Sequence, residues 1–212
     1  MASLNAVISP NPHPDPDIIG ALADGDGLKE VPWSIQVRGR PGQRVAEVAT
    51  RHGLTHSTEL PLMIRRPEAG SPAKPATGAV RLRSVEGDEL GLYARIMADC
   101  FGVPHEAFEM FADPALAATS GFTLYLAEIS GEPVGTGMAA VSGDLLGVFN
   151  IGVLPQHRRQ GYGQLITTEI VRAHYAAGAT TAYLYSSAMG ESVYASAGFH
   201  TEEVLTMFTA PA

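Results

Sequence analysis

Three apolar runs in the second half of the chain have the composition of β-strands. They span residues 122–129 (FTLYLAEI), 133–141 (PVGTGMAAV) and 145–153 (LLGVFNIGV). Short polar connections that contain glycine separate them, at residues 130–132 and 142–144. Such connections are typical of β-hairpins. We therefore expect a meander of three antiparallel strands.

The period of the apolar residues changes after Pro155. Ile166, Ile170 and Ala173 follow one another at helical spacing, and Gly178 is a typical helix stop. Beyond this helix the pattern predicts a strand at 180–187, a short helix at 190–198 and a final strand at 201–209. Strands that alternate with helices in this way predict an α+β fold.

The first part of the chain divides by composition. Residues 1–30 are rich in Pro, Asp and Gly, and we expect them to form a flexible N-terminal arm. Residues 31–66 contain a predicted strand, a short helix and a second strand, and residues 67–78 have the composition of a linker. A further strand and helix follow between 79 and 101, so we expect the main domain to span 79–212.

Residues 31–66 run in the same order as the C-terminal unit: strand, glycine, short helix, glycine, strand. This order predicts a degenerate half-repeat that needs another segment or a second chain to close its core. Chance is the alternative, because strand–helix–strand units are common. Ala46 occupies the place that Tyr194 has in the C-terminal unit, so this partial half-domain should carry no catalytic group.

Composition excludes several classes of protein. The chain has 212 residues, of which 45% are hydrophobic and 17% charged, and its net charge is -8. No apolar run reaches the ~18 residues of a membrane-spanning helix, and no basic run exceeds two residues. We therefore expect no membrane and no nucleic-acid partner. Cys100 is the single cysteine and should be a buried apolar residue, and with no signal-like N-terminus the prediction is a cytoplasmic protein.

The stretch from Asn150 to Gly163 (NIGVLPQHRRQGYG) carries the clearest chemical signal. A strand leads into a loop with Arg158, Arg159, Gly161 and Gly163, and the loop opens a helix. Unpaired N–H groups at a helix N-terminus attract anions, and glycines let the backbone approach a bulky ligand. The two arginines add positive charge. A diphosphate is the ligand that this pattern predicts.

Two common diphosphate-binding folds do not fit. No Lys-Ser or Lys-Thr pair follows the glycines, so the loop lacks the cation and the magnesium ligand of a nucleoside triphosphatase. The third glycine of a dinucleotide fingerprint is also absent, and Ser186-Ser187 stands where a ribose-binding acid is expected. A nicotinamide or flavin enzyme is therefore disfavoured.

The loop resembles the coenzyme A motif of the GNAT superfamily of N-acetyltransferases. Residues 153–163 match the family pattern Val-x-Pro-x-x-(Arg or Gln)-x-x-Gly-x-(Gly or Ala), and Tyr194 stands four residues before Gly198-Phe199, as in the family's second motif. The resemblance covers residues 79 to 210. It implies a mixed, mostly antiparallel sheet with helices on both faces, and acetyl-CoA as the acyl donor without a metal.

The same resemblance implies roles for particular residues. The strand ending at Val153 should splay from its neighbour, so that Ile151 and Val153 pair with the pantetheine arm of acetyl-CoA. Arg158, Arg159, Gly161 and Gly163 should hold the diphosphate. Tyr194 should protonate the departing thiolate, and its alternative reading is a core aromatic residue.

We expect an enzyme that transfers an acetyl group to a primary amine of a small molecule or a protein by direct attack. The alternative is an acyl-CoA sensor or a non-catalytic module on the same fold. No general base is identifiable, although Glu106, Glu109, Glu202 and Glu203 lie in segments that line the acceptor pocket in relatives. The chain should be a monomer or a homodimer.

Overall fold

The computed structural model describes residues 5–28, 31–67, 80–188 and 190–211. Contacts between residues divide the chain into two compact units. Unit 1 gathers residues 1–63, 185–189 and 201–212, and unit 2 gathers residues 64–184 and 190–200. Nearly all of the predicted linker lies outside the described residues.

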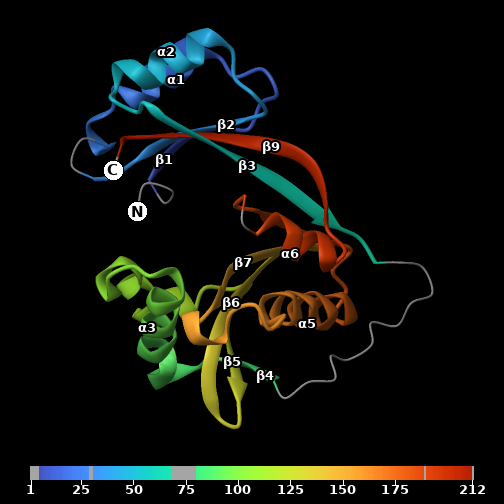
Figure 1. Cartoon of the computed structure of the whole chain (residues 1–212). Helices are drawn as coiled ribbons and strands as arrows, with labels where there is room; N and C mark the ends of the chain where they lie inside the picture. Colours follow the sequence, from blue (N-terminus) through green and yellow to red (C-terminus); the bar gives the residue numbers. More distant parts are fainter. Residues whose placement is uncertain (1–4, 29–30, 68–79, 189, 212) are drawn as a thin grey trace. The chain divides into compact units, whose positions relative to one another are not determined.

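Unit 2 is built on a sheet with the strand order β8-β7-β6-β5-β4 (Figure 1). Its strands pair antiparallel, apart from the parallel pair β7–β8. The meander predicted from the three apolar runs is confirmed. The strands are β4 (Val80–Ser84), β5 (Phe122–Ile129), β6 (Glu132–Ser142), β7 (Leu145–Val153) and β8 (Thr181–Tyr185).

Helices cover both faces of this sheet. On one face, Tyr93 and Met97 of α3 pack with Phe108 and Phe111 on Leu126 of β5. On the other, α5 lies so close to β6 that a Cβ on Gly137 would stand 2.7 Å from Ile170 Cδ1. The helices of unit 2 are η2 (Gly87–Glu89), α3 (Leu90–Phe101), η3 (His105–Ala112), α4 (Pro114–Ala117), η4 (Pro155–His157), α5 (Tyr162–Ala176) and α6 (Glu191–Ser196).

Unit 1 has the strand order β1-β2-β9-β3. Two helices supply its core: Ile19 of α1 and Val48 of α2 pack with Ile35, Val37 and Phe208 of the strands. The elements are β1 (Ala6–Ser9), α1 (Pro16–Ala23), η1 (Asp26–Leu28), β2 (Ser34–Arg38), α2 (Gln43–Arg51), β3 (His56–Arg65) and β9 (His200–Thr209). The mixed α+β, mostly antiparallel fold predicted from the sequence is confirmed.

The segment expected to be a flexible arm contains two regular elements, which corrects that expectation. β1 pairs in parallel with β2, and Val7 is 6% exposed in the core. Asp15 caps α1 by accepting hydrogen bonds from the N–H groups of Asp17 and Ile18, and Pro16 occupies the first turn. A capping carboxylate followed by proline is a helix start, so the local signal was present among the prolines.

The N-terminal strand–helix–strand unit takes a strand from the other end of the sequence. β2 pairs antiparallel with β9, from Ser34 opposite Thr209 to Arg38 opposite Leu205. The core of this unit therefore includes Phe208, which lies outside residues 31–66. Whether it descends from a degenerate repeat stays a prediction.

Candidate functional site

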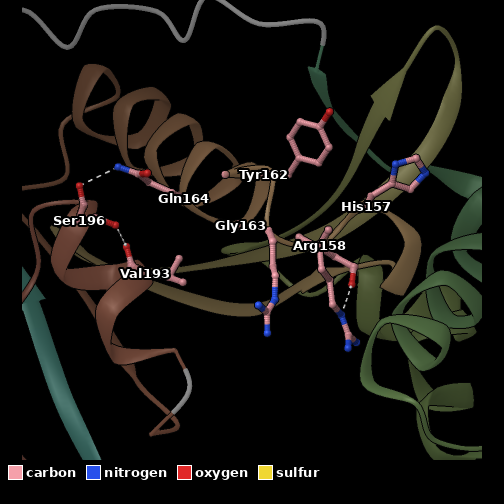
Figure 2. Close-up of a pocket in the computed structure, with 10 residues that line it drawn as sticks. His157, Arg158, Tyr162, Gly163, Gln164, Val193 and Ser196 are labelled. Atoms are coloured by element: carbon pink, nitrogen blue, oxygen red, sulfur yellow. Dashed lines mark hydrogen bonds between the residues drawn. The ribbon is translucent and has the colours of Figure 1, made fainter.

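An open pocket of about 260 Å³ lies at the N-terminus of α5 (Figure 2). It brings together five of the seven site residues predicted from the sequence, while Ile151 and Tyr194 are not in its lining. α6 contributes Val193 and Ser196, which the sequence analysis did not single out. The lining residues are Val153, His157, Arg158, Arg159, Gly161, Tyr162, Gly163, Gln164, Val193 and Ser196.

The first amides of α5 have no capping side chain. Gly161 is the N-cap residue, and no side chain accepts a hydrogen bond there. α2, α3 and α6 likewise lack a side-chain cap, whereas Asp15 and Asp113 cap α1 and α4 with their carboxylates. The first N–H groups of a helix point outward, and the helix dipole makes this end positive. The floor of the pocket can therefore hold an anion.

Two positive φ angles shape the loop before α5. Gly161 has φ 81° and Arg159 has φ 59°. A Cβ added to Gly161 would meet nothing within 4 Å. Glycine is therefore required here by the backbone angle, and the space beside it is left open for a ligand.

The two arginines of the loop have different surroundings. The Arg158 guanidinium donates to the carbonyl oxygen of Cys100, at 2.7 Å, and to that of Val153, at 3.2 Å. Among the described residues, the Arg159 side chain has no ion-pair or hydrogen-bond partner, and it is exposed. Arg159 is thus the cation that the loop offers to the pocket.

β7 leaves β8 midway along its length. The two strands pair only from Leu145 to Gly147 within the part of the chain that the structure describes. Leu154 N–H donates to Val134 O of β6 at 2.9 Å, and main-chain groups alternate along a strand. The polar backbone groups of Ile151 and Val153 therefore face the side that β8 has left. The predicted splay of this strand is confirmed.

A β-bulge interrupts β7 where the open edge begins. Phe149 pairs with Met138 and Gly152 with Thr136, so Asn150 and Ile151 together oppose one residue of β6. Asn150 has φ 53°, and its carbonyl accepts a hydrogen bond from Thr136 Oγ1 at 2.9 Å. Bulges bend a strand and re-aim its backbone groups. This bulge turns the edge of β7 away from β8.

Tyr194 lies on α6 and is partly buried. Its ring meets Phe199 edge to face, with the ring centroids 6.3 Å apart. Burial raises the pKa of its hydroxyl above the usual value. The phenol is therefore protonated at neutral pH and can act as a proton donor.

Sequence reasoning missed the contacts that fix α6. Gln164 Nε2 of α5 donates to Ser196 O at 2.8 Å, as Figure 2 shows. Arg65 Nη1 donates to the carbonyl of Ala197, at the C-terminus of α6, at 2.7 Å. Arg65 and Gln164 lie far from α6 in the sequence, and no local pattern marks their partners.

The other residues singled out from the sequence lie elsewhere. Cys100 is 5% exposed, as predicted for a core residue, and burial raises the pKa of its thiol to about 12. Glu106 and Glu109 line a second pocket, of about 280 Å³, with Arg95 and His105. Glu203 is ion-paired with Arg38, and Glu202 is exposed.

Two features are absent from the residues that the structure describes. No group of three or more His, Cys, Asp or Glu residues is placed to bind a metal ion there. None of the described helices has both the length and the apolar character needed to cross a membrane.

Comparison with a family model decides the classification. Residues 120–201 match the model of the acetyltransferase (GNAT) domain. This part of the chain is similar to GNAT acetyltransferase domains. The match runs from just before β5 to the start of β9, and so includes the loop before α5 and Tyr194. No sequence among curated proteins matches the chain.

Several solved structures share the fold of this chain. A GCN5-related N-acetyltransferase from Kribbella flavida has a TM-score of 0.68 at 20% identity, with 98% of this chain and 81% of that chain covered. A GCN5-related N-acetyltransferase from Sphaerobacter thermophilus has a TM-score of 0.61 at 19% identity, covering 86% and 62%. A functionally unknown conserved protein from Staphylococcus epidermidis has a TM-score of 0.67 at 14% identity, covering 100% and 87%. Identities this low show the fold alone.

Proposed function

We propose that this protein transfers an acetyl group from acetyl-CoA to a primary amine of a small molecule or a protein. The observation that carries the proposal is the continuity of the site. The uncapped amides of α5 lie at one end, and the open edge of β7 runs from Val153 to the bulge at Asn150. This order matches a ligand with a diphosphate at one end and an amide-containing arm.

The fit of coenzyme A rests on the space and chemistry of the loop. Gly161 has open space beside it, and a Cβ on Gly163 would meet only Val193 and Val153, at 3.7 and 3.9 Å. The diphosphate would accept hydrogen bonds from the N–H groups at the start of α5 and pair with Arg159. Ile151 and Val153 would bond the amides of the pantetheine arm as an added strand does.

The chemistry needs two proton movements. The amine nitrogen attacks the thioester carbonyl, the new C–N bond forms, and the C–S bond breaks to release a thiolate. Tyr194 gives its hydroxyl proton to that thiolate, because a phenol near the leaving group is a suitable acid. The amine loses its proton to water, which also returns one to Tyr194. An N–H group at the bulge would stabilise the oxyanion.

The test combines binding and turnover. At about one hundred times its dissociation constant, acetyl-CoA should stabilise the protein by ~2.7 kcal/mol, seen as a raised melting temperature. A panel of amines and peptides should then reveal an acceptor through release of free thiol. Binding without any turnover would favour the acyl-CoA sensor instead. No melting shift with acetyl-CoA, coenzyme A or longer acyl-CoAs would refute the proposal.

A further inference from the structure

We propose that the two adjacent arginines of the loop have separate tasks. Arg158 is a positioning residue that ties the end of α3 to the end of β7, and Arg159 supplies the positive charge that the phosphates bind. This assignment rests on the proposed binding of coenzyme A. It revises the sequence-based expectation, in which both arginines hold the diphosphate.

The hydrogen bonds of Arg158 are made within the protein. Cys100 is the penultimate residue of α3, and carbonyls in the last turn of a helix have no partner within the helix. The Arg158 guanidinium donates a hydrogen bond to the Cys100 carbonyl oxygen at 2.7 Å. It does so at the end of α3 where the helix dipole favours a cation. Its Nε donates to Val153 O at 3.2 Å. One planar guanidinium thus bridges two carbonyls from separate elements.

The two elements also touch beneath this bridge. A Cβ added to Gly152 would stand 2.7 Å from Cys100 Cβ and 3.0 Å from Thr136 Oγ1. α3 and β7 therefore meet here without room for a side chain, and the glycine is required by close approach. The Arg158 bridge fixes the Val153 carbonyl on the open edge where the pantetheine arm would pair.

Arg159 differs from Arg158 in its contacts. Both arginines are exposed and line the pocket beside the uncapped amides of α5, but the Arg159 side chain has no ion-pair or hydrogen-bond partner among the described residues. An uncommitted guanidinium next to helix N–H groups is suited to a phosphate. A positive charge is all that this role demands, so lysine should serve at this position. Lysine cannot reproduce the planar fork that Arg158 uses.

The experiment compares R158K, R158M, R159K and R159A with the wild type, using coenzyme A and pantetheine as ligands. Pantetheine carries the arm without the phosphates. Calorimetry is done well below each variant's melting temperature, in 50 and 500 mM salt. R81A, which removes an exposed arginine of β4, is the control for a general loss of charge and should bind coenzyme A like the wild type.

For Arg159, we expect R159A to weaken coenzyme A binding about tenfold in 50 mM salt and by less than threefold in 500 mM salt, because salt screens the lost charge. R159K should stay within about threefold of the wild type. Neither change should alter the dissociation constant of pantetheine, since that ligand has no phosphate for Arg159 to bind.

For Arg158, we expect R158K and R158M to weaken the binding of coenzyme A and of pantetheine about equally, by roughly five- to tenfold. The salt dependence of coenzyme A binding should stay that of the wild type. A role in overall stability alone would lower the melting temperature and leave pantetheine binding unchanged in the folded protein. That result, or rescue by R158K, would overturn the assignment of Arg158. If the wild type bound neither ligand, the proposed function itself would fail.

Discussion

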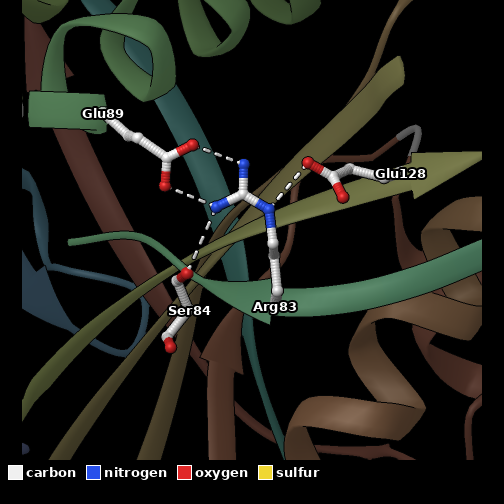
Figure 3. Close-up of polar contacts among 4 residues, drawn as sticks. All are labelled: Arg83, Ser84, Glu89 and Glu128. Carbon is white, nitrogen blue, oxygen red and sulfur yellow. Dashed lines mark hydrogen bonds and ion pairs between the residues drawn. The ribbon is translucent and has the colours of Figure 1, made fainter. Parts of the chain in front are cut away.

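Arg83 of β4 donates from Nε to the Glu128 carboxylate of β5 at 2.7 Å (Figure 3). The same guanidinium makes two further bonds, at 2.6 and 2.7 Å, to Glu89 of η2. These hydrogen bonds hold the pKa of Glu89 below its usual value. Glu128 is 8% exposed, and among the described residues Arg83 is its only ion-pair partner. The three residues tie the edge strand β4 to the start of α3.

Arg83→Met should destabilise the protein. The change keeps much of the side-chain volume but leaves Glu128 buried without its cation. We expect a loss of about 2–3 kcal/mol, less than the 3–5 kcal/mol of fully buried pairs because Arg83 retains some exposure. Urea unfolding is the measurement, and Arg81→Met on the same strand is the matched control, with an expected change within about 0.5 kcal/mol. Equal losses in the two variants would show that Glu128 needs no cation.

Tyr194→Phe should separate catalysis from packing. It keeps the ring that contacts Phe199 and removes the hydroxyl. If the phenol protonates the thiolate, turnover should fall by a factor on the order of 10² to 10⁴, while acetyl-CoA binds with similar affinity. Tyr125→Phe, on β5 and outside the lining of the pocket, is the control and should retain turnover. Activity of the Tyr194 variant within about twofold of the wild type would assign this residue to packing.

The Tyr194 variant offers a second readout. A more acidic thiol gives a thiolate that leaves more readily, so an acyl donor with such a thiol needs less help from a proton donor. The loss of turnover should therefore shrink with such a donor. An equal loss for both donors would point to a disturbed active site rather than a missing acid.

Gly161→Val should abolish the stabilisation by acetyl-CoA. Gly161 and Gly178 both have positive φ, 81° and 108°, and both have open space beside them. Valine at either position should cost about 2 kcal/mol of stability through backbone strain. Only the Gly161 variant adds a side chain to the phosphate loop, so only it should lose the ligand-induced rise in melting temperature. A normal rise in that variant would place the phosphates elsewhere.

A chain that begins at Gly78 should form oligomers or aggregate in solution. β9 would lack β2, and Phe208, which is 7% exposed, would be uncovered along with its neighbours. Uncovered apolar residues and an unpaired strand edge promote association. Light scattering after size exclusion should detect oligomers or aggregate. A stable and fully active monomer would show that residues 1–77 are dispensable for folding.

The loop from Arg158 to Gly163 and the helix after it could be predicted from the sequence because their information is local. Gly161 and Gly163 follow a strand and precede a helix within a few residues, and the structure places both in one pocket. The partners of Arg158 could not be found in this way. The acceptor is the main-chain oxygen of Cys100, which every residue type has, so the residue type at position 100 does not predict the bond. The same holds for Arg65 and Ala197.

The N-terminal segment shows a different limit. Four prolines and several acidic residues give residues 1–30 the composition of a flexible arm. Composition is an average over the segment and does not show a local helix start or a buried strand residue within it. Asp15 followed by Pro16 favours a helix start at this point, and Val7 is buried because β2 lies beside it. Which strands pair depends on the whole fold, so the pattern of neighbouring residues in the sequence cannot predict it.

The pairing of β2 with β9 also imposes an order in time. Ser34 to Val37 are buried, and Ser34 lies opposite Thr209, so β2 leaves the ribosome long before its partner strand is made. At 5–20 residues per second, the wait is roughly 10–35 s. Through that interval the early strand has an apolar surface and no neighbour in β9. The apolar residues Ile35 and Val37 therefore gain their neighbours in β9 only when residues 205–209 have been made.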